Sequence, residues 1–171
     1  DIFKYQDDIK FIYDNINLEA TMINPNEAYT EYVTLILYNY WLYRIKYHTK
    51  ESNRHKFIKE RLLIELGWSF YQTAKTIKFF KCFNSYDDLF NKDKSCKFKQ
   101  KTNVLSYYIL KTYFLYNSHI FINCINLNNE KKRFDCINNI NLQDINFSKQ
   151  INNILDNVKD YDLSMRMTCL E

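Results

Sequence analysis

Leu37-Tyr38-Asn39-Tyr40-Trp41-Leu42-Tyr43 is the stretch from which the expected fold follows, because the chain repeats its pattern as Leu110-Lys111-Thr112-Tyr113-Phe114-Leu115-Tyr116. Both copies read Leu-x-x-Tyr-aromatic-Leu-Tyr. The same spacing separates Cys96 from Cys169, and each of these cysteines follows a small hydroxyl residue. A pattern that recurs at a fixed spacing indicates a repeated structural unit. The sequence therefore predicts two copies of one helical unit, over residues 27–96 and 100–169.

The composition favours helices over sheets. The 171 residues include one glycine and one proline, whereas average usage is about 7% and 5%. Tight turns and β-hairpins depend on these residues, so we expect long helices joined by Asn, Asp and Lys. Without glycine-rich loops neither a P-loop nor a dinucleotide fingerprint can form, and no cofactor is predicted. A chain of this length fits one compact domain, here residues 1–171.

Hydrophobic periodicity predicts where the helices lie. The expected helices comprise residues 1–23, 27–50, 53–82, 102–125 and 133–160. The first is short and amphipathic, and Pro25 suits the first position of the second. Residues 27–50 are apolar or aromatic nearly all round, which is typical of a buried helix. Their charged residues, among them Glu31 and Arg44, oppose a membrane span. The prediction is an all-α tandem repeat of two helical hairpins plus a short N-terminal helix.

Five cysteines in a short chain indicate an oxidising compartment and a disulfide-stapled fold. The repeat scheme pairs Cys82 with Cys96 and Cys136 with Cys169, and leaves Cys124 as a free thiol. A local pair of Cys124 with Cys136 is an alternative, and a third possibility is that all five are reduced and buried. Closing loops of this size contributes about 3 kcal/mol each in the chain-entropy model.

Two further features agree with secretion. The chain begins at Asp1 without methionine, as it would if a signal peptide had been removed or left out. The sequon Asn146-Phe147-Ser148 makes Asn146 a candidate glycosylation site. The predicted location is extracellular, or inside host tissue after delivery.

No catalytic or metal-binding constellation is visible in the sequence. His48 and His55 are seven residues apart, which is a poor spacing for zinc on one helix. A cysteine nucleophile paired with His48 or His119 is formally possible, but cysteines that are expected to be oxidised cannot serve as nucleophiles. The acidic pairs, such as Asp87-Asp88, are adjacent, and adjacent residues of a helix do not face each other. Solvation or helix capping is their expected role. We therefore expect neither an enzyme nor a bound metal.

A lysine-rich segment, which we call the basic tract, could contact an acidic partner. It comprises Lys92, Lys94, Lys97, Lys99 and Lys101. The alternative is an ordinary solvated polar surface. Lysine rather than arginine dominates, which opposes base-specific nucleic-acid reading, and the net charge is only +4. Aromatic residues make up 18% of the chain; they are expected mainly in the core, although exposed tyrosines suit protein recognition.

Two cysteine–tyrosine–cysteine arrangements carry a family resemblance. They are Cys82…Tyr86…Cys96 and Cys136…Tyr161…Cys169. A pair of such motifs resembles the bicycle proteins, the secreted effectors of gall-forming aphids. The two spacings differ from each other, and Cys124 is additional. The resemblance implies secretion from a salivary gland into a plant and a role in altering host tissue or defence, without enzymatic activity.

A second, shorter resemblance covers about 25 residues. The segment Arg44-Ile45-Lys46-Tyr47-His48-Thr49-Lys50, with Trp68 downstream, is similar to a helix of the malaria reticulocyte-binding-homologue invasion ligands. This would imply a helical ligand for a red-cell receptor. The rest of the chain does not follow that family.

The expected function is therefore binding rather than catalysis. The first hypothesis is a secreted effector that binds a host protein and alters plant physiology. The alternatives are a helical receptor-binding ligand of a parasite and a structural subunit of an intracellular assembly. The last of these predicts five free thiols and an exposed apolar surface.

Overall fold

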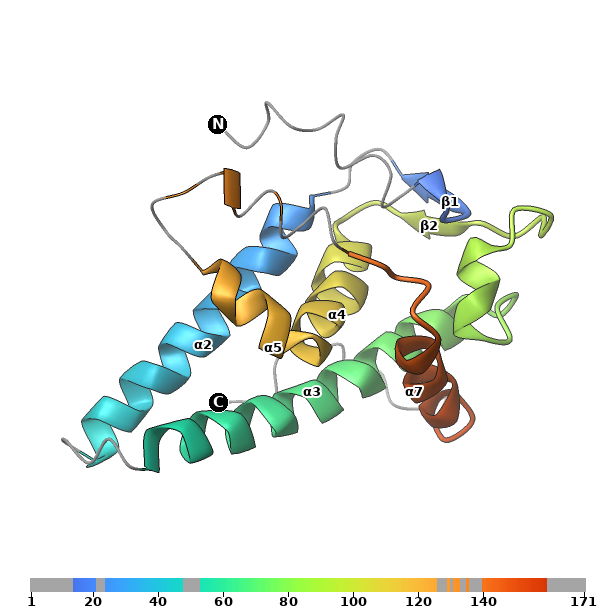
Figure 1. The fold of residues 1–171 in the computed structure, drawn as a ribbon. Coiled ribbons are helices and arrows are strands. Elements are labelled where there is room, and N and C mark those ends of the chain that lie inside the picture. Colours follow the sequence, from blue (N-terminus) through green and yellow to red (C-terminus); the bar gives the residue numbers. More distant parts are fainter. Residues whose placement is uncertain are drawn as a thin grey trace.

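The computed structural model describes residues 14–20, 24–47, 53–125, 129, 131–132, 135 and 140–159. Most of these residues are helical, as predicted, and two short strands form a small sheet (Figure 1). The elements in chain order are β1 (Leu18–Ala20), α2 (Pro25–Tyr47), α3 (Arg54–Phe79), the 3-10 helix η3 (Tyr86–Phe90), β2 (Phe98–Gln100), the π-helix η4 (Leu105–Leu110), α4 (Lys111–Tyr116), α5 (Ser118–Phe121), the 3-10 helix η5 (Ile122–Cys124) and α7 (Ile145–Leu155).

The two long helices α2 and α3 form the frame of the molecule. They diverge like the arms of a V, and α4 and α5 lie between the arms, while α7 packs beside the C-terminal half of α3 (Figure 1). Helix α2 begins at Pro25, as predicted, and the Asn24 side chain donates a hydrogen bond to the Glu27 carboxylate at 3.2 Å. Helix α3 ends at Phe79, close to its predicted end. Both predicted helices of the first unit are thus confirmed.

Aromatic packing around Phe147 joins the C-terminal helix to the rest of the core. Phe147 is fully buried. Its ring centre lies 5.2–5.6 Å from those of Phe70, Tyr86, Tyr113 and Tyr116. Edge-to-face and tilted contacts at this distance each add about 0.5–1.5 kcal/mol beyond area burial. These contacts connect α3, η3, α4 and α7 within one core cluster.

The predicted helix over residues 102–125 is interrupted. Its first part is the π-helix η4, whose Leu105 N–H donates to the Gln100 side chain at 2.8 Å. Asn117 separates α4 from α5, and both its backbone N–H and its side-chain amide donate to the Tyr113 carbonyl. Such local side-chain bonds compete with the helical ladder. A single straight helix was therefore the wrong prediction.

The predicted helix over 133–160 is also shorter in its described part. Residues 140–144 are not helical, and α7 begins only at Ile145. The reason is local: the Asp144 carboxylate accepts the Phe147 N–H at 2.7 Å. This is the N-cap arrangement that starts a helix.

The predicted N-terminal helix ends in a strand instead. Residues 1–13 and 21–23 lie outside the described residues, but Leu18–Ala20 form β1, which pairs in parallel with β2. Asn17 explains this. Its N–H donates to the Leu89 carbonyl at 2.7 Å, its carbonyl accepts the Phe98 N–H at 2.8 Å, and its side-chain amide lies 2.9 Å from the Cys96 carbonyl. These long-range bonds hold an extended backbone that local periodicity did not indicate.

The tandem repeat is not confirmed. In the second copy of the motif, Leu110 and Phe114 are fully buried in the core. In the first copy, the corresponding Leu37 and Trp41 are 52% and 56% exposed. One pattern thus occupies two different environments, since packing partners and not periodicity decide which positions are covered.

A buried polar seam joins α3 to η4 and α4. The Lys111 ammonium lies 2.8 Å from the Glu65 carboxylate, and these side chains are 1% and 0% exposed. About two turns further along α3, the Thr73 hydroxyl donates to the Tyr108 carbonyl at 2.7 Å and lies 2.9 Å from the Thr112 hydroxyl. A charge pair without water must be matched in position, because either charge alone is costly there. The seam therefore sets the register of α4 on α3.

Replacing Lys111 with Met should lower the free energy of unfolding by about 3–5 kcal/mol, because the buried Glu65 carboxylate loses its ion pair with the Lys111 ammonium. The double variant Glu65→Leu/Lys111→Met should recover most of this loss, since neither charge remains. Chemical denaturation of the wild type and the variants measures both values. A loss below about 1 kcal/mol for the single variant would contradict the assigned role.

Candidate functional site

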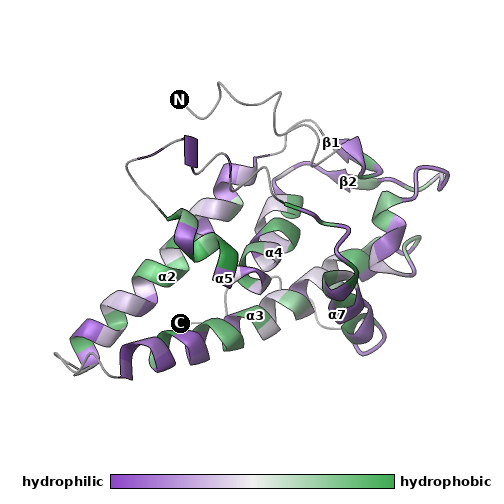
Figure 2. Ribbon diagram, viewed as in Figure 1, coloured by the Kyte–Doolittle hydropathy of each residue, from purple (hydrophilic) through white to green (hydrophobic). Residues whose placement is uncertain are grey.

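A groove of about 740 Å³, open along one side, lies between α2, α3 and the segment from α4 to η5. In Figure 2, hydrophobic stretches alternate with hydrophilic ones along α2 and the first half of α3, and α5 includes a hydrophobic stretch. The lining residues are Ile36, Leu37 and Tyr40 from α2; Arg54, His55, Ile58, Lys59, Leu62, Leu63 and Leu66 from α3; and Leu115, Tyr116, Ser118, His119 and Ile122. We call this feature the groove.

The α2 wall exists because only one face of this helix is buried. Tyr43 is buried and lies 5.5 Å from the Phe57 ring, and Asn39 accepts a 2.6 Å hydrogen bond from Arg61. These contacts join α2 to α3 along one side. Residues on the neighbouring side, Leu37 and Tyr40, remain exposed. The prediction that α2 is buried nearly all round was therefore wrong, and its uncovered face lines the groove.

The α3 wall follows from helical spacing. His55, Ile58, Leu62 and Leu66 recur at intervals of three or four residues, so they share one face of the helix. Leu63, on the rim, is 55% exposed. The stripe extends over about three helical turns, or roughly 16 Å. This wall is a continuous apolar surface with polar groups toward the start of α3.

The ionisable groups with nitrogen-based side chains in the groove are all basic. Basic or potentially basic side chains come from Arg54, His55, Lys59 and His119, and the lining contains no acidic residue among the described part of the chain. The Arg54 guanidinium lies 5.5 Å from the centre of the Tyr40 ring, across the groove from α3 to α2. Cation–π contacts of this kind hold a cation over an aromatic face. The groove is therefore apolar at its centre and positive toward the N-terminal end of α3.

Of the predicted disulfides, Cys82–Cys96 is confirmed. Between the two cysteines, Tyr86 is fully buried, and its hydroxyl donates to the Leu142 carbonyl at 3.1 Å. Burial raises the pKa of Tyr86 well above its usual value, with a smaller contribution from Asp87. The tyrosine of this cysteine–tyrosine–cysteine motif is thus a structural anchor between η3 and the segment before α7.

The prediction that Cys124 is a free thiol is wrong, because Cys124 is disulfide-bonded. Its partner lies outside the described residues, as do Cys136, Cys169 and Tyr161 of the second motif. Cys124 ends η5, two residues after the groove residue Ile122. The backbone there is also held by the Tyr29 hydroxyl, which donates to the Cys124 carbonyl at 3.1 Å. The third wall of the groove is therefore covalently and sterically fixed.

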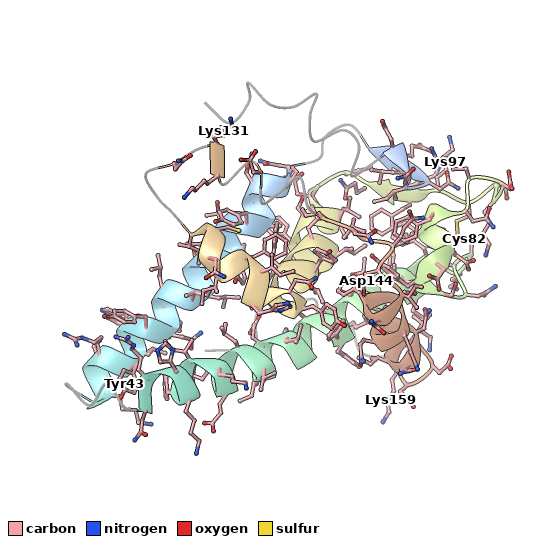
Figure 3. All side chains as sticks on the ribbon, in the orientation of Figure 1. Tyr43, Cys82, Lys97, Lys131, Asp144 and Lys159 are labelled. Atoms are coloured by element: carbon pink, nitrogen blue, oxygen red, sulfur yellow. A yellow bond between two sulfur atoms is a disulfide. The ribbon has the colours of Figure 1, made fainter. Side chains whose placement is uncertain are left out.

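The basic tract lies far from the groove. Figure 3 places Lys97 and Cys82 at the end of the molecule opposite Tyr43. Lys94 forms a 2.6 Å ion pair with Asp88, Lys99 lies 3.2 Å from Glu19, and Lys92 donates to a backbone carbonyl. Lys97 and Lys101 are exposed. The tract thus serves partly to hold its own loop, and its role as a contact patch stays a prediction.

The acidic pair Asp87-Asp88 has a structural role. The Asp88 carboxylate accepts the backbone N–H groups of Asn84 and Ser85. Burial alone would raise the pKa of Asp88, but the hydrogen bonds from Lys94 and from these two amides outweigh it and lower that pKa. Asp87 accepts a 2.7 Å bond from the Ser148 hydroxyl. The expected capping role is confirmed for Asp88.

The remaining candidates are separate from one another. Asn146 is exposed on the first turn of α7, whereas Ser148 of the same sequon is buried. His55 and His119 both line the groove, and His48 lies outside the described residues. In the described part of the chain no three His, Cys, Asp or Glu side chains are grouped as a metal site would require, and no helix there is long and apolar enough to cross a membrane.

Comparison with known proteins adds no relative. No family model matches the chain, and neither the curated proteins nor the solved structures contain a significant match.

Groove and core leucines should respond differently to substitution. Leu63→Ser should change the free energy of unfolding by less than about 0.5 kcal/mol, since surface substitutions rarely matter. Leu89→Ala should lower it by about 2–5 kcal/mol, because this fully buried side chain outside the groove would leave a cavity. Denaturant unfolding measures both. Equal losses would mean that Leu63 is covered in solution.

Thiol mapping should find Cys82, Cys96 and Cys124 protected in the oxidised protein. Alkylation before reduction should leave all three unlabelled, and alkylation after reduction should label each, because every disulfide releases two thiols. Peptide mass mapping reads the result, and protein from a reducing host is the matched control. Labelling of any of the three before reduction would contradict the bonds described.

Proposed function

We propose that this protein is a secreted, non-enzymatic effector that binds a host protein through the groove. The observation that carries the proposal is the groove itself, an apolar concave surface that includes exposed side chains such as Leu37, Tyr40 and Leu63. Contiguous exposed apolar surface usually marks an interaction site. The resemblance to bicycle proteins supports the same class of function.

The disulfides support an extracellular setting. Cys82–Cys96 closes a loop at one end of the molecule, and Cys124 forms a second bond beside the groove. Disulfides persist in oxidising environments and are rare in the cytosol. A rigid wall also lowers the ordering cost of binding, because less freedom is lost when the partner docks.

The lining argues for binding rather than catalysis. Catalysis by a histidine–nucleophile pair needs a third group, commonly a carboxylate, that orients the histidine. Ser118, His55 and His119 line the groove, but no carboxylate does so within the described residues. Large leucine and isoleucine side chains occupy most of the surface. Protein recognition uses such surfaces, with aromatic residues and arginine enriched at their centres.

The exposed apolar surface also favours a second candidate, a structural subunit of a larger assembly. That hypothesis expects free thiols, which the bonds at Cys82, Cys96 and Cys124 oppose. For the receptor-binding ligand, Arg44 and Lys46 are exposed at the end of α2, and the rest of the resembling segment up to Lys50 lies largely outside the described residues. The effector hypothesis remains our proposal.

The test compares capture of host proteins by the wild type and by Leu63→Glu. We expect a host protein retained by the wild type to be lost with Leu63→Glu, because a charge in the apolar wall must be desolvated on binding. Ile145→Glu is the matched control, since Ile145 is an exposed isoleucine on α7 outside the groove. Quantitative mass spectrometry of proteins captured from plant extract measures the difference.

Retention by both variants would place binding elsewhere on the molecule and overturn the proposal. Hydrolysis or group transfer by the purified wild type that is lost on substituting His55 or His119 would overturn its non-enzymatic part. Circular dichroism should first show equal helix content in all three proteins.

A further inference from the structure

We infer that the occupant of the groove is an acidic amphipathic helix of the partner protein. This inference rests on the proposed function and specifies the chemistry of the segment that docks. It combines the shape of the groove with the sign of its charges.

The shape fits a helix. The groove residues of α3, from His55 to Leu66, form one stripe about three turns long. Ile36 and Tyr40 on α2 face it, one turn apart, and Leu115 belongs to the third wall. A helix packs on others at interaxial distances of about 8–10 Å. Helix-in-groove recognition places apolar anchors at i, i+3 or i+4, and i+7, which matches the spacing of the stripe.

The charge selects an acidic partner. Arg54, His55, Lys59 and His119 belong to the lining, and no acidic residue does so among the described positions. Helix α3 also has no acidic residue in its first turn, so the partial positive charge of its N-terminal end adds to the same field. A partner helix with carboxylates beside its apolar face would meet complementary charge, whereas a basic helix would be repelled.

A second copy of this chain is a poor occupant. The described amphipathic helix α7 uses its apolar face internally, since Phe147, Ile151 and Leu155 are all buried. To dock into a second molecule it would have to leave its own core. The exposed apolar face of α2 is also a poor occupant, because Arg44 and Lys46 in the last turn of that helix would meet basic side chains in the groove. We therefore expect the occupant to come from another protein.

The test uses a designed peptide of about 16 residues with leucines at i, i+3, i+4, i+7 and i+11 and glutamates flanking them. A second peptide carries lysines in place of the glutamates, and a third has the acidic composition with a scrambled order. Fluorescence anisotropy with the full chain measures the dissociation constants. The acidic amphipathic peptide should bind at least tenfold more tightly than either of the others, and added salt should weaken it.

Charge reversal in the groove provides the matched variants. The double variant Lys59→Glu/His119→Glu should bind the acidic peptide about tenfold more weakly than the wild type does. It should bind the lysine peptide more tightly. Lys149→Glu reverses one charge on an exposed residue of α7 outside the groove and should leave both affinities unchanged. Leu63→Glu should abolish binding of the acidic peptide, with helix content preserved.

Each alternative result has a distinct meaning. Equal binding of the acidic and lysine peptides would overturn the charge selection. Absence of peptide binding, together with groove-dependent capture of a host protein, would overturn this inference and leave the proposed function standing. Self-association of the wild type that Leu63→Glu removes would make a second copy the occupant. Loss of both peptide binding and groove-dependent capture would overturn both proposals.

Discussion

The buried ion pair between Glu65 and Lys111 is the constraint on which the arrangement of the helices depends. Two opposite, buried charges at 2.8 Å tolerate little displacement, because separating them away from solvent costs free energy. The pair and the Thr73–Thr112 contact hold α4 against the middle of α3. Ser69, Gln72 and Ser106 in the same seam are buried and make no side-chain hydrogen bond among the described residues. The seam thus fixes the position of α4 on α3, while its buried polar atoms without a hydrogen bond lower the stability of the fold.

This placement of α4 explains the groove. With α4 held on α3, the chain turns at Asn117, and α5 and η5 continue beside the arms of the V (Figure 1). They cover part of α2, whose Tyr32 is fully buried and has its pKa raised to about 12, chiefly by burial. They leave part of the second half of α2 uncovered, and Leu37, Tyr40 and Trp41 stay exposed there. The position of α4 on α3 therefore determines the groove as well, because the seam holds α4 in place and α4 directs α5 and η5.

Parts of the site could be recognised from the sequence and other parts could not. The helices that form two walls were predicted close to their observed bounds, because their periodicity is long and continuous. Their outer residues could not be assigned to core or surface, because Leu37 and Leu110 occupy equivalent places in the same motif yet differ completely in burial. Nothing in the local pattern singled out Arg54 or Lys59 of α3, because their position near Ile122 depends on contacts between distant segments.

By itself the sequence determined the features that depend on neighbouring residues: the helical class, the start of α2 at Pro25 and the approximate extent of α3. The bond between Cys82 and Cys96 was one of several pairings that the sequence allowed. The tertiary structure decided what depends on distant residues. Asn17 holds a strand where a helix was expected, through hydrogen bonds to Leu89 and Phe98. Lys111 on α4 forms its ion pair with Glu65 on α3, which is far away in the sequence. Local preferences are worth tenths of a kcal/mol per residue, whereas a buried charge or polar group left unpaired costs several times more. Where the two disagreed, the long-range contact prevailed.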